Sequence, residues 1–292
     1  MFSTLHVRAL PLWAVCLALT APSAVLAQGA ASKVTLPKGK AAGKATNAKP
    51  GKSVPPTPAE IAALANQDLE VAARAAETLG NSSSPVAHDA LIDALALGTP
   101  PEVAVPAIRA VASHPVATDV AALSRYAHHV NPSVRSVAIV ALANYAASEA
   151  QQVIVARLGD QVLKVRAAAA DAAARAKVRS AIDPMLVLLV RGEEGPAHSI
   201  AAMADPDLTR RVAELIGKAP EPVLAMCLGE ILRRPDFGPD TARVEVVRAI
   251  GKIADPSAMG ALVDYLDNSP KNENRTSQQE AKLIVDARRG GR

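Results

Sequence analysis

Two stretches decide the fold, NPSVRSVAIVAL at residues 131–142 and VLKVRAAAADAA at residues 162–173. Their valines Val134 and Val165 are 31 residues apart, and two further stretches align with them on Val71 and Val103. In all four, a small residue follows the valine after four positions and an aliphatic one after eight, namely Ala75, Ala107, Ala138 and Ala169, then Leu79, Val111, Leu142 and Ala173. Offsets of zero, four and eight share one face of an α-helix, so the pattern predicts a repeated helix that buries the same face each time.

A second helical pattern lies between successive members of this series. These partners are residues 85–97, 118–129, 149–158 and 179–191, and the scheme continues through 206–217, 221–233, 239–254 and 256–268. In the last pair the order is open, because 239–254 resembles a second helix of a repeat more than a first. Half of the residues are hydrophobic but only 2% are aromatic, which favours helices over sheets. The sequence therefore predicts an all-α protein, an α-solenoid of two-helix repeats over residues 59–268.

The two ends of the chain differ from this body. Residues 1–27 predict a cleaved signal peptide, with an apolar segment at 9–19 that is too short to span a bilayer and a cleavage site after Ala27. Residues 28–58, rich in Lys, Ala and Pro, predict a disordered linker, and residues 269–292 predict a basic tail with room for one short helix. We expect an exported protein, periplasmic or secreted, with no transmembrane segment in the mature chain.

Charge is distributed unevenly along the chain. Residues 28–59 hold six lysines and no acid, whereas residues 60–269 hold 19 basic and 25 acidic residues, a net charge of −6. A nucleic-acid-binding fold normally carries a basic folded surface, so no specific nucleic acid is expected as a partner. Cleavage would leave Cys227 as the single cysteine, within an apolar helical stretch, and we expect it to be a buried structural thiol.

The sequence around Asn131 to Arg135, followed by Ala138 and Leu142, resembles the second helix of a HEAT repeat, of the short kind found in phycobilisome lyases. Asp160 with Val165 and Arg166 fits the same pattern, as do residues 249–256. The resemblance implies an Asp–Arg ladder between repeats, which Asp160 and Arg166 match. It also implies that the second helices line the binding surface.

The exposed face of the predicted second helices falls at offsets three, six and ten from the aligned residue. On it we predict partner-binding residues, which are Arg74, Glu77, Arg109, Asn144, Asp171 and Arg175. Arg109 and Arg175 would anchor a protein partner, with Tyr126 or Tyr145 as further candidates, because binding energy concentrates on Arg and aromatic residues.

No sequence motif for phosphate binding, metal binding or nucleophilic catalysis occurs, so no catalytic, cofactor or metal residues are expected. The adjacent His128 and His129 point about 100° apart on a helix and would chelate one metal poorly. Glu193 and Glu194, in a Gly-bracketed loop, are interpreted as solvated acids.

We therefore predict a non-catalytic scaffold of the bacterial cell envelope that binds another protein through the solenoid surface. One alternative is attachment to anionic envelope polymers through the Lys-rich linker. Another is an enzyme similar to the HEAT-type lyases, and a HEAT-like DNA glycosylase is a further enzymatic option. The export signal argues against the lyase, and the acidic body argues against the glycosylase.

Overall fold

The computed structural model describes residues 55–269 and 275–290, and within these ranges every regular element is helical. All of these elements belong to one compact unit, Pro50–Arg292. The predicted signal peptide and most of the predicted linker lie outside the described residues. Among the described helices, none combines the length and the apolar character that crossing a membrane requires.

The helices form two layers, which we call the first-helix and second-helix layers. The first-helix layer holds α1 (Pro58–Ala62) with η1 (Ala63–Ala65), α3 (Pro85–Leu97), α5 (Asp119–Tyr126), α7 (Ser148–Arg157), η2 (Arg179–Ala181) with α9 (Ile182–Val190), α11 (Pro206–Ala213), α13 (Asp240–Gly251) and α15 (Thr276–Gly290). The second-helix layer holds α2 (Leu69–Gly80), α4 (Pro101–Ser113), α6 (Pro132–Leu142), α8 (Leu163–Arg175), α10 (Glu194–Met203), α12 (Glu221–Arg233) and α14 (Pro256–Asn268).

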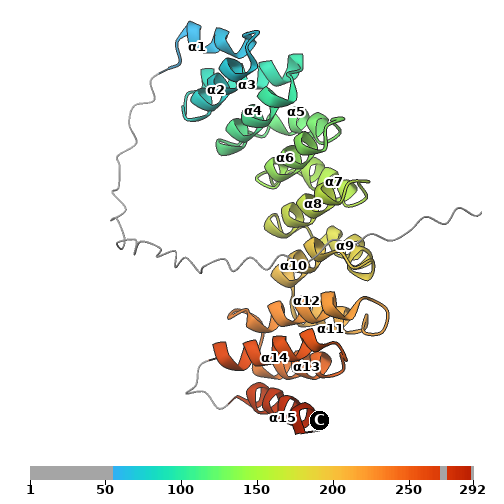
Figure 1. The fold of residues 1–292 in the computed structure, drawn as a ribbon. Helices are drawn as coiled ribbons and strands as arrows, with labels where there is room; N and C mark the ends of the chain where they lie inside the picture. Colours follow the sequence, from blue (N-terminus) through green and yellow to red (C-terminus); the bar gives the residue numbers. More distant parts are fainter. Residues whose placement is uncertain (1–54, 270–274, 291–292) are drawn as a thin grey trace, which may run out of the picture. The chain divides into compact units, whose positions relative to one another are not determined.

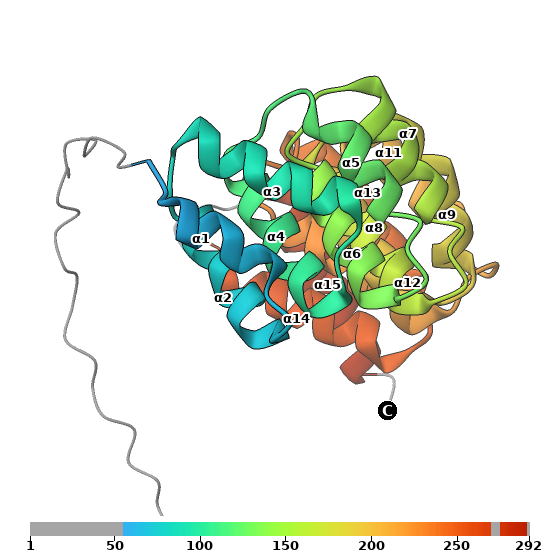
Figure 2. The same ribbon diagram turned by 90° about the horizontal axis from the view of Figure 1, so that it is seen from above.

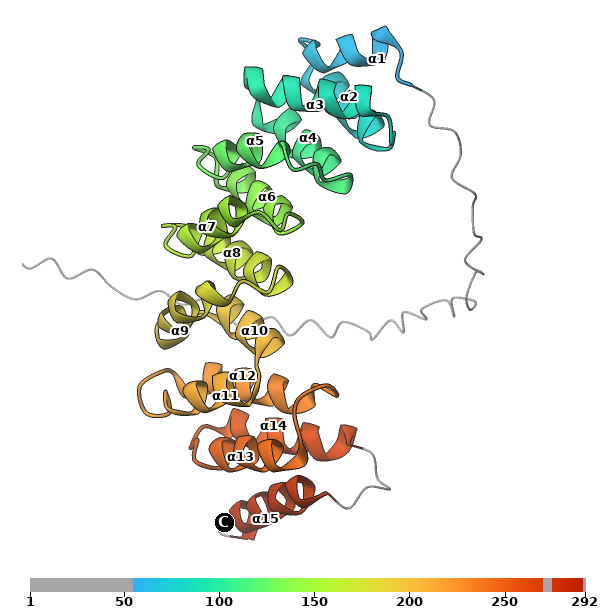
Figure 3. The ribbon, with the colours of Figure 1, turned by 180° about the vertical axis from the view of Figure 1, so that it is seen from behind.

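Contacts between helices follow the order of the chain. Each second helix packs on the next one, from α2 on α4 through to α12 on α14, and each first helix from α1 to α13 also packs on the second helix of its own pair. Figure 1 and Figure 3 show the resulting stack from α1 to α15. Viewed from above, α5, α7, α9 and α11 lie along one side, and α2, α6, α12 and α14 along the other (Figure 2). The described helices thus form an α-solenoid in which each pair seals its neighbours.

The predicted face of the second helices forms the core of this stack. Val103, Val134 and Val165 are buried, and so are the alanines four positions later. Small side chains let successive second helices approach closely. At the contact of α2 with α4, a Cβ added to Gly80 would lie 2.4 Å from the Cβ of Ala110. Proline at the first position of α6, with the Asn131 side chain accepting from the Ser133 amide, begins that helix as the sequence predicts.

The structure settles the order of the last pair. Helix α13 contacts α11 and α15, the neighbouring first helices, whereas α14 contacts α12, the preceding second helix. The resemblance of residues 249–256 to a second helix is therefore misleading. An amphipathic pattern shows which face of a helix is buried but not which layer the helix joins, since helices of both layers bury one face.

Helix α15 also lies outside the range predicted for the solenoid. It packs on α13 and α14 and buries Ser277, Ala281 and Val285. The Arg288 guanidinium donates to the carbonyls of Gly251 and Ile253 at 2.8 and 2.6 Å. This part of the basic tail therefore continues the stack.

Candidate partner-binding site on the second helices

A groove crosses the exposed face of three consecutive second helices, α4, α6 and α8, and has a volume of about 480 Å³. Its lining consists of Arg109, Ala112 and Ser113 from α4, Ser136, Val137, Val140 and Ala141 from α6, Asn144 just beyond α6, and Lys164, Ala168 and Arg175 from α8. We call it the α4–α8 groove. Its volume falls in the range typical of ligand-binding clefts.

The charged side chains that line the α4–α8 groove are basic. They are Arg109, Lys164 and Arg175, and among the described residues no acid is part of the lining. Arg175 is paired within its own helix, with its Nε 3.1 Å from Asp171. Within residues 55–269 and 275–290, neither Arg109 nor Lys164 makes an ion pair, and both are exposed. A locally cationic groove thus lies on a body whose net charge, over residues 60–269, is −6.

Three of the six predicted partner-binding residues line the α4–α8 groove, namely Arg109, Asn144 and Arg175. Asp171 is not part of the lining but forms an ion pair with Arg175. Arg74 and Glu77 lie on α2 and are not part of its lining. The two tyrosines are not available for binding. Tyr126 is buried with its hydroxyl donating to the Leu95 carbonyl at 3.0 Å, and Tyr145 is buried as well.

Asn144 and Arg175, which follow the aligned valines by ten positions, also stabilise the end of the preceding second helix. The sequence did not indicate this role. The Asn144 side-chain amide donates to the Ala112 carbonyl at 2.9 Å, and an Arg175 guanidinium nitrogen donates to the Val140 carbonyl at 3.2 Å. Each therefore caps a free carbonyl near the end of the preceding second helix. Arg109 and Lys164 have no such contact, so they are the lining cations that remain free for a ligand.

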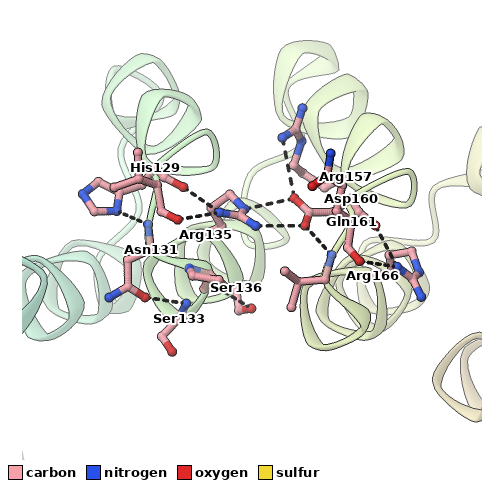
Figure 4. Close-up of polar contacts among 12 residues, drawn as sticks. His129, Asn131, Ser133, Arg135, Ser136, Arg157, Asp160, Gln161 and Arg166 are labelled. Carbon is pink, nitrogen blue, oxygen red and sulfur yellow. Dashed lines mark hydrogen bonds and ion pairs between the residues drawn. The ribbon is translucent and has the colours of Figure 1, made fainter. Parts of the chain in front are cut away.

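The edge of the stack that carries the turns holds a ladder of ion pairs, and Figure 4 shows its rung between Arg135 and Asp160. Arg135 forms two hydrogen bonds of 2.9 Å to the Asp160 carboxylate of the next repeat. In the same way, the Arg166 Nε lies 2.9 and 3.0 Å from the two carboxylate oxygens of Glu193. Each Arg also donates to carbonyls of the turn before its own helix, as Arg135 does to His129 at 2.8 Å.

Asp160 and Arg166 both belong to the ladder, as the resemblance implies. Their side chains do not pair with each other, because each rung joins an Arg to the acid of the following repeat, but Arg166 also donates to the Asp160 main-chain carbonyl at 2.8 Å. Arg135, for which no Asp occurs nearby in the sequence, finds one 25 residues later. Glu193 is not simply solvated, since its side chain is 9% exposed and fully engaged by Arg166.

The surroundings of Asp160 shift its protonation equilibrium. Burial alone would raise the pKa of this carboxyl group. The hydrogen bonds from Arg135, the hydrogen bond from the Val162 amide and the positive charges of Arg135 and Arg157 outweigh burial, so the pKa of Asp160 lies below its ordinary value. The ladder therefore holds this acid in its charged form.

The first-helix layer holds a buried polar network that the sequence did not indicate. Asp119 on α5 has no exposed side-chain surface, and it accepts from the Tyr145 hydroxyl and the Val116 amide at 2.9 and 2.8 Å. The His88 Nε2 on α3 lies 2.9 Å from the other carboxylate oxygen. Burial, and then the contact with Asp119, raise the pKa of Tyr145. The network joins neighbouring repeats and leaves the Asp119 carboxylate fully hydrogen-bonded.

Cys227 is buried in α12, as the sequence predicts. Burial strongly raises the pKa of its thiol, which makes it a poor nucleophile. In the described part of the chain, His, Cys, Asp and Glu side chains do not gather in groups of three or more that could hold a metal ion.

Comparisons with known proteins give matches among solved structures alone. No family model matches the sequence, and no curated protein matches it either. One similar structure is the complex of CpcE and CpcF of phycocyanin lyase from Nostoc sp., with 18% identity, a TM-score of 0.44, and coverage of 84% of this chain and 99% of that one. Human deoxyhypusine hydroxylase matches at 16% identity and a TM-score of 0.37, covering 80% and 95% of the two chains.

A third similar structure is the karyopherin Kap121p bound to the extreme C-terminus of the phosphatase Cdc14p. It has 15% identity and a TM-score of 0.45, and the match covers 78% of this chain but only 29% of the karyopherin. The sequence-based prediction that the protein is not an enzyme is wrong on this comparison, because the matched lyase and hydroxylase are enzymes.

Proposed function

We propose that this protein is a HEAT-type solenoid that binds a segment of another protein in the α4–α8 groove. The Arg–acid ladder between repeats supports the HEAT assignment, because Arg135 with Asp160 and Arg166 with Glu193 repeat one geometry in successive turns. The observation that carries the binding function is the groove itself, an apolar floor with free cations on the second helices.

The floor and the rim of the α4–α8 groove support a protein ligand. Val137, Val140 and Ala168 are partly buried side chains of the floor, and they would bury further apolar surface on binding. Arg109 and Lys164 on the rim supply direction and charge. Interfaces combine an apolar centre with a polar rim in this way.

Site-directed photo-crosslinking in the producing cell tests this function. A photoreactive amino acid would replace Val137 or Ala168 in the groove and, as matched controls, Arg125 on α5 or Ser148 on α7, which are exposed and line neither this groove nor the hollow between α5 and α7. We expect a discrete protein adduct from the groove positions and none from the controls. Adducts of equal yield at all four positions, or none in the groove, would contradict the proposal.

We also propose that the protein works in the bacterial cell envelope. The support is in the sequence, where residues 1–27 have the charge, the apolar segment and the small residues of an export signal. N-terminal sequencing of the protein recovered from the envelope should begin at Gln28. Recovery in the cytoplasm with residue 1 intact would refute this localisation.

A further inference from the structure

We propose that the ligand of the α4–α8 groove is an acidic segment of another protein, in extended form, with aliphatic residues between its carboxylates. This inference rests on the proposed function and names the chemistry of the partner. It follows from three features of the groove, namely its charge, its floor and its length.

The charge of the groove selects the sign of the partner. Arg109 at one side of the groove and Lys164 at the other have no ion pair among the described residues, whereas Arg233 on the later second helix α12 does. Its guanidinium is 3.4 Å from Asp264 on α14. Cations left free beside an apolar floor, on a body of net negative charge, attract carboxylates and repel basic segments.

The floor selects the residues between those carboxylates. Val137, Val140 and Ala168 are aliphatic, and no aromatic residue or acid lines the groove. Apolar contact with such a floor favours Leu, Val or Ile in the ligand, and it leaves nothing for a nucleic-acid base to stack on.

The length of the groove sets the size of the segment. Packed helices lie about 8–10 Å apart, so a groove that crosses α4, α6 and α8 spans roughly 20 Å, the length of about six extended residues. Carboxylates at both ends of such a segment would reach Arg109 and Lys164 while its centre covers the floor. The protein's own residues 28–58 do not fit, because they contain six lysines and no acid.

Three mixtures of fluorescent hexapeptides test the inference against the full chain. All have two central residues drawn from Leu, Val and Ile, flanked on each side by two residues that are Asp or Glu in the first mixture, Asn or Gln in the second, and Lys or Arg in the third. Fluorescence anisotropy at low and high salt should show that the acidic mixture binds roughly tenfold more tightly than the neutral one and loses most of this advantage at high salt. The basic mixture should bind most weakly.

Variants locate the binding in the groove. The double variant Arg109→Glu with Lys164→Glu should weaken binding of the acidic mixture by roughly tenfold or more. Its matched control, Arg125→Glu with Lys218→Glu, makes the same change in net charge at exposed positions that do not line the groove and should bind normally. Ala168→Phe fills the floor without changing the charge and should weaken the acidic and neutral mixtures alike. Matched thermal unfolding curves would show that each variant is folded.

The outcomes separate this inference from the proposed function. Equal binding of acidic and neutral mixtures, or an equal effect of the control pair, would overturn the inference, and a preference for the basic mixture would do so too. If groove positions still crosslink to a protein in that case, the proposed function stands with a partner of different chemistry. If acidic peptides bind as expected but the groove gives no crosslink in the cell, the proposed function is wrong. The preference of the groove for acidic segments would still stand.

Discussion

The two halves of the second-helix layer join their repeats by different means. In the first half, the Arg135–Asp160 pair connects repeats at the edge that carries the turns, and the exposed face of α4, α6 and α8 is free of ion pairs between helices. In the second half, the His198–Glu230 hydrogen bond and the Arg233–Asp264 ion pair cross from helix to helix on the exposed face itself. Ion pairs at the edge therefore leave a face available for a ligand, and polar contacts across the face occupy it.

The sequence register explains where the change occurs. The position after the aligned residue is Arg135 in α6 and Arg166 in α8, but the step of 31 residues then reaches Pro196 and Ala197 in α10. Without an Arg at this position, no further rung of this kind can form. The buried Arg243 takes over part of the joining role, since it donates to the carbonyls of Leu232 and Arg234 at 2.8 and 2.9 Å and so caps α12.

The largest effect is expected from Arg135→Met. The side chains of Arg135 and Asp160 are only 13% and 6% exposed, so the substitution leaves a buried carboxylate without its main partner. We expect the free energy of unfolding to fall by about 3 kcal/mol in urea denaturation. Arg125→Met, an exposed Arg on α5, removes the same charge and should change stability by less than about 0.5 kcal/mol. Equal losses in the two variants would show that the edge ladder has no special role.

The next effect concerns close packing. In Gly80→Ala, the new Cβ would meet the Cβ and Cα of Ala110 at 2.4 and 2.9 Å, so α2 and α4 must move apart. We expect a loss of about 1–2 kcal/mol. Gly260→Ala in α14 meets nothing within 4 Å and should gain up to about 1 kcal/mol from helix propensity. Thermal unfolding of both variants checks the difference, and a stabilised Gly80→Ala would contradict the packing described for α2 and α4.

A smaller effect should appear in the pH dependence. Because the pKa of Asp160 is lower in the folded protein than in the unfolded chain, its contribution is complete above the unfolded pKa. The contribution is lost as the pH falls through the folded pKa. The stability difference between the protein and its Asp160→Asn variant should therefore narrow from pH 6 to pH 3, as measured by urea denaturation at each pH. A difference that stays constant or widens in acid would argue against a charged Asp160.

The smallest effect is expected on the exposed face of the second half. Arg233 and Asp264 are 42% and 57% exposed and 3.4 Å apart, so Arg233→Met should cost at most about 0.5 kcal/mol. Urea denaturation of Arg233→Met beside Arg135→Met compares the ion pair on the exposed face directly with the ladder at the edge. A loss as large as that of Arg135→Met would mean that pairs on the face join the repeats as strongly as the ladder does.

The sequence predicted the repeat, most helix positions and the buried face, because these follow from spacing along one helix. It placed Arg109, Asn144 and Arg175 on the exposed face that carries the α4–α8 groove for the same reason. It could not assign the partner of Arg135, because a rung joins residues 25 positions apart and depends on how two repeats stack.

Two other features also depend on how neighbouring helices stack, so the sequence could not predict them. The capping role of Asn144 depends on the end of the preceding helix, and the layer of α13 depends on its neighbours. The sequence left room for a short helix in residues 269–292 but did not indicate that α15 packs on the stack, because the few apolar residues that hold it, Ala281 and Val285, are a weak signal.

The burial of Cys227 has a practical consequence. Its thiol is fully enclosed within α12 and is the only cysteine in the described part of the chain. A thiol reagent can reach it only while that segment is transiently open, so the rate of its modification counts the openings of the middle of the stack under native conditions. Cys227 is therefore a native probe of local opening in the middle of the stack, and the measurement needs no engineered label.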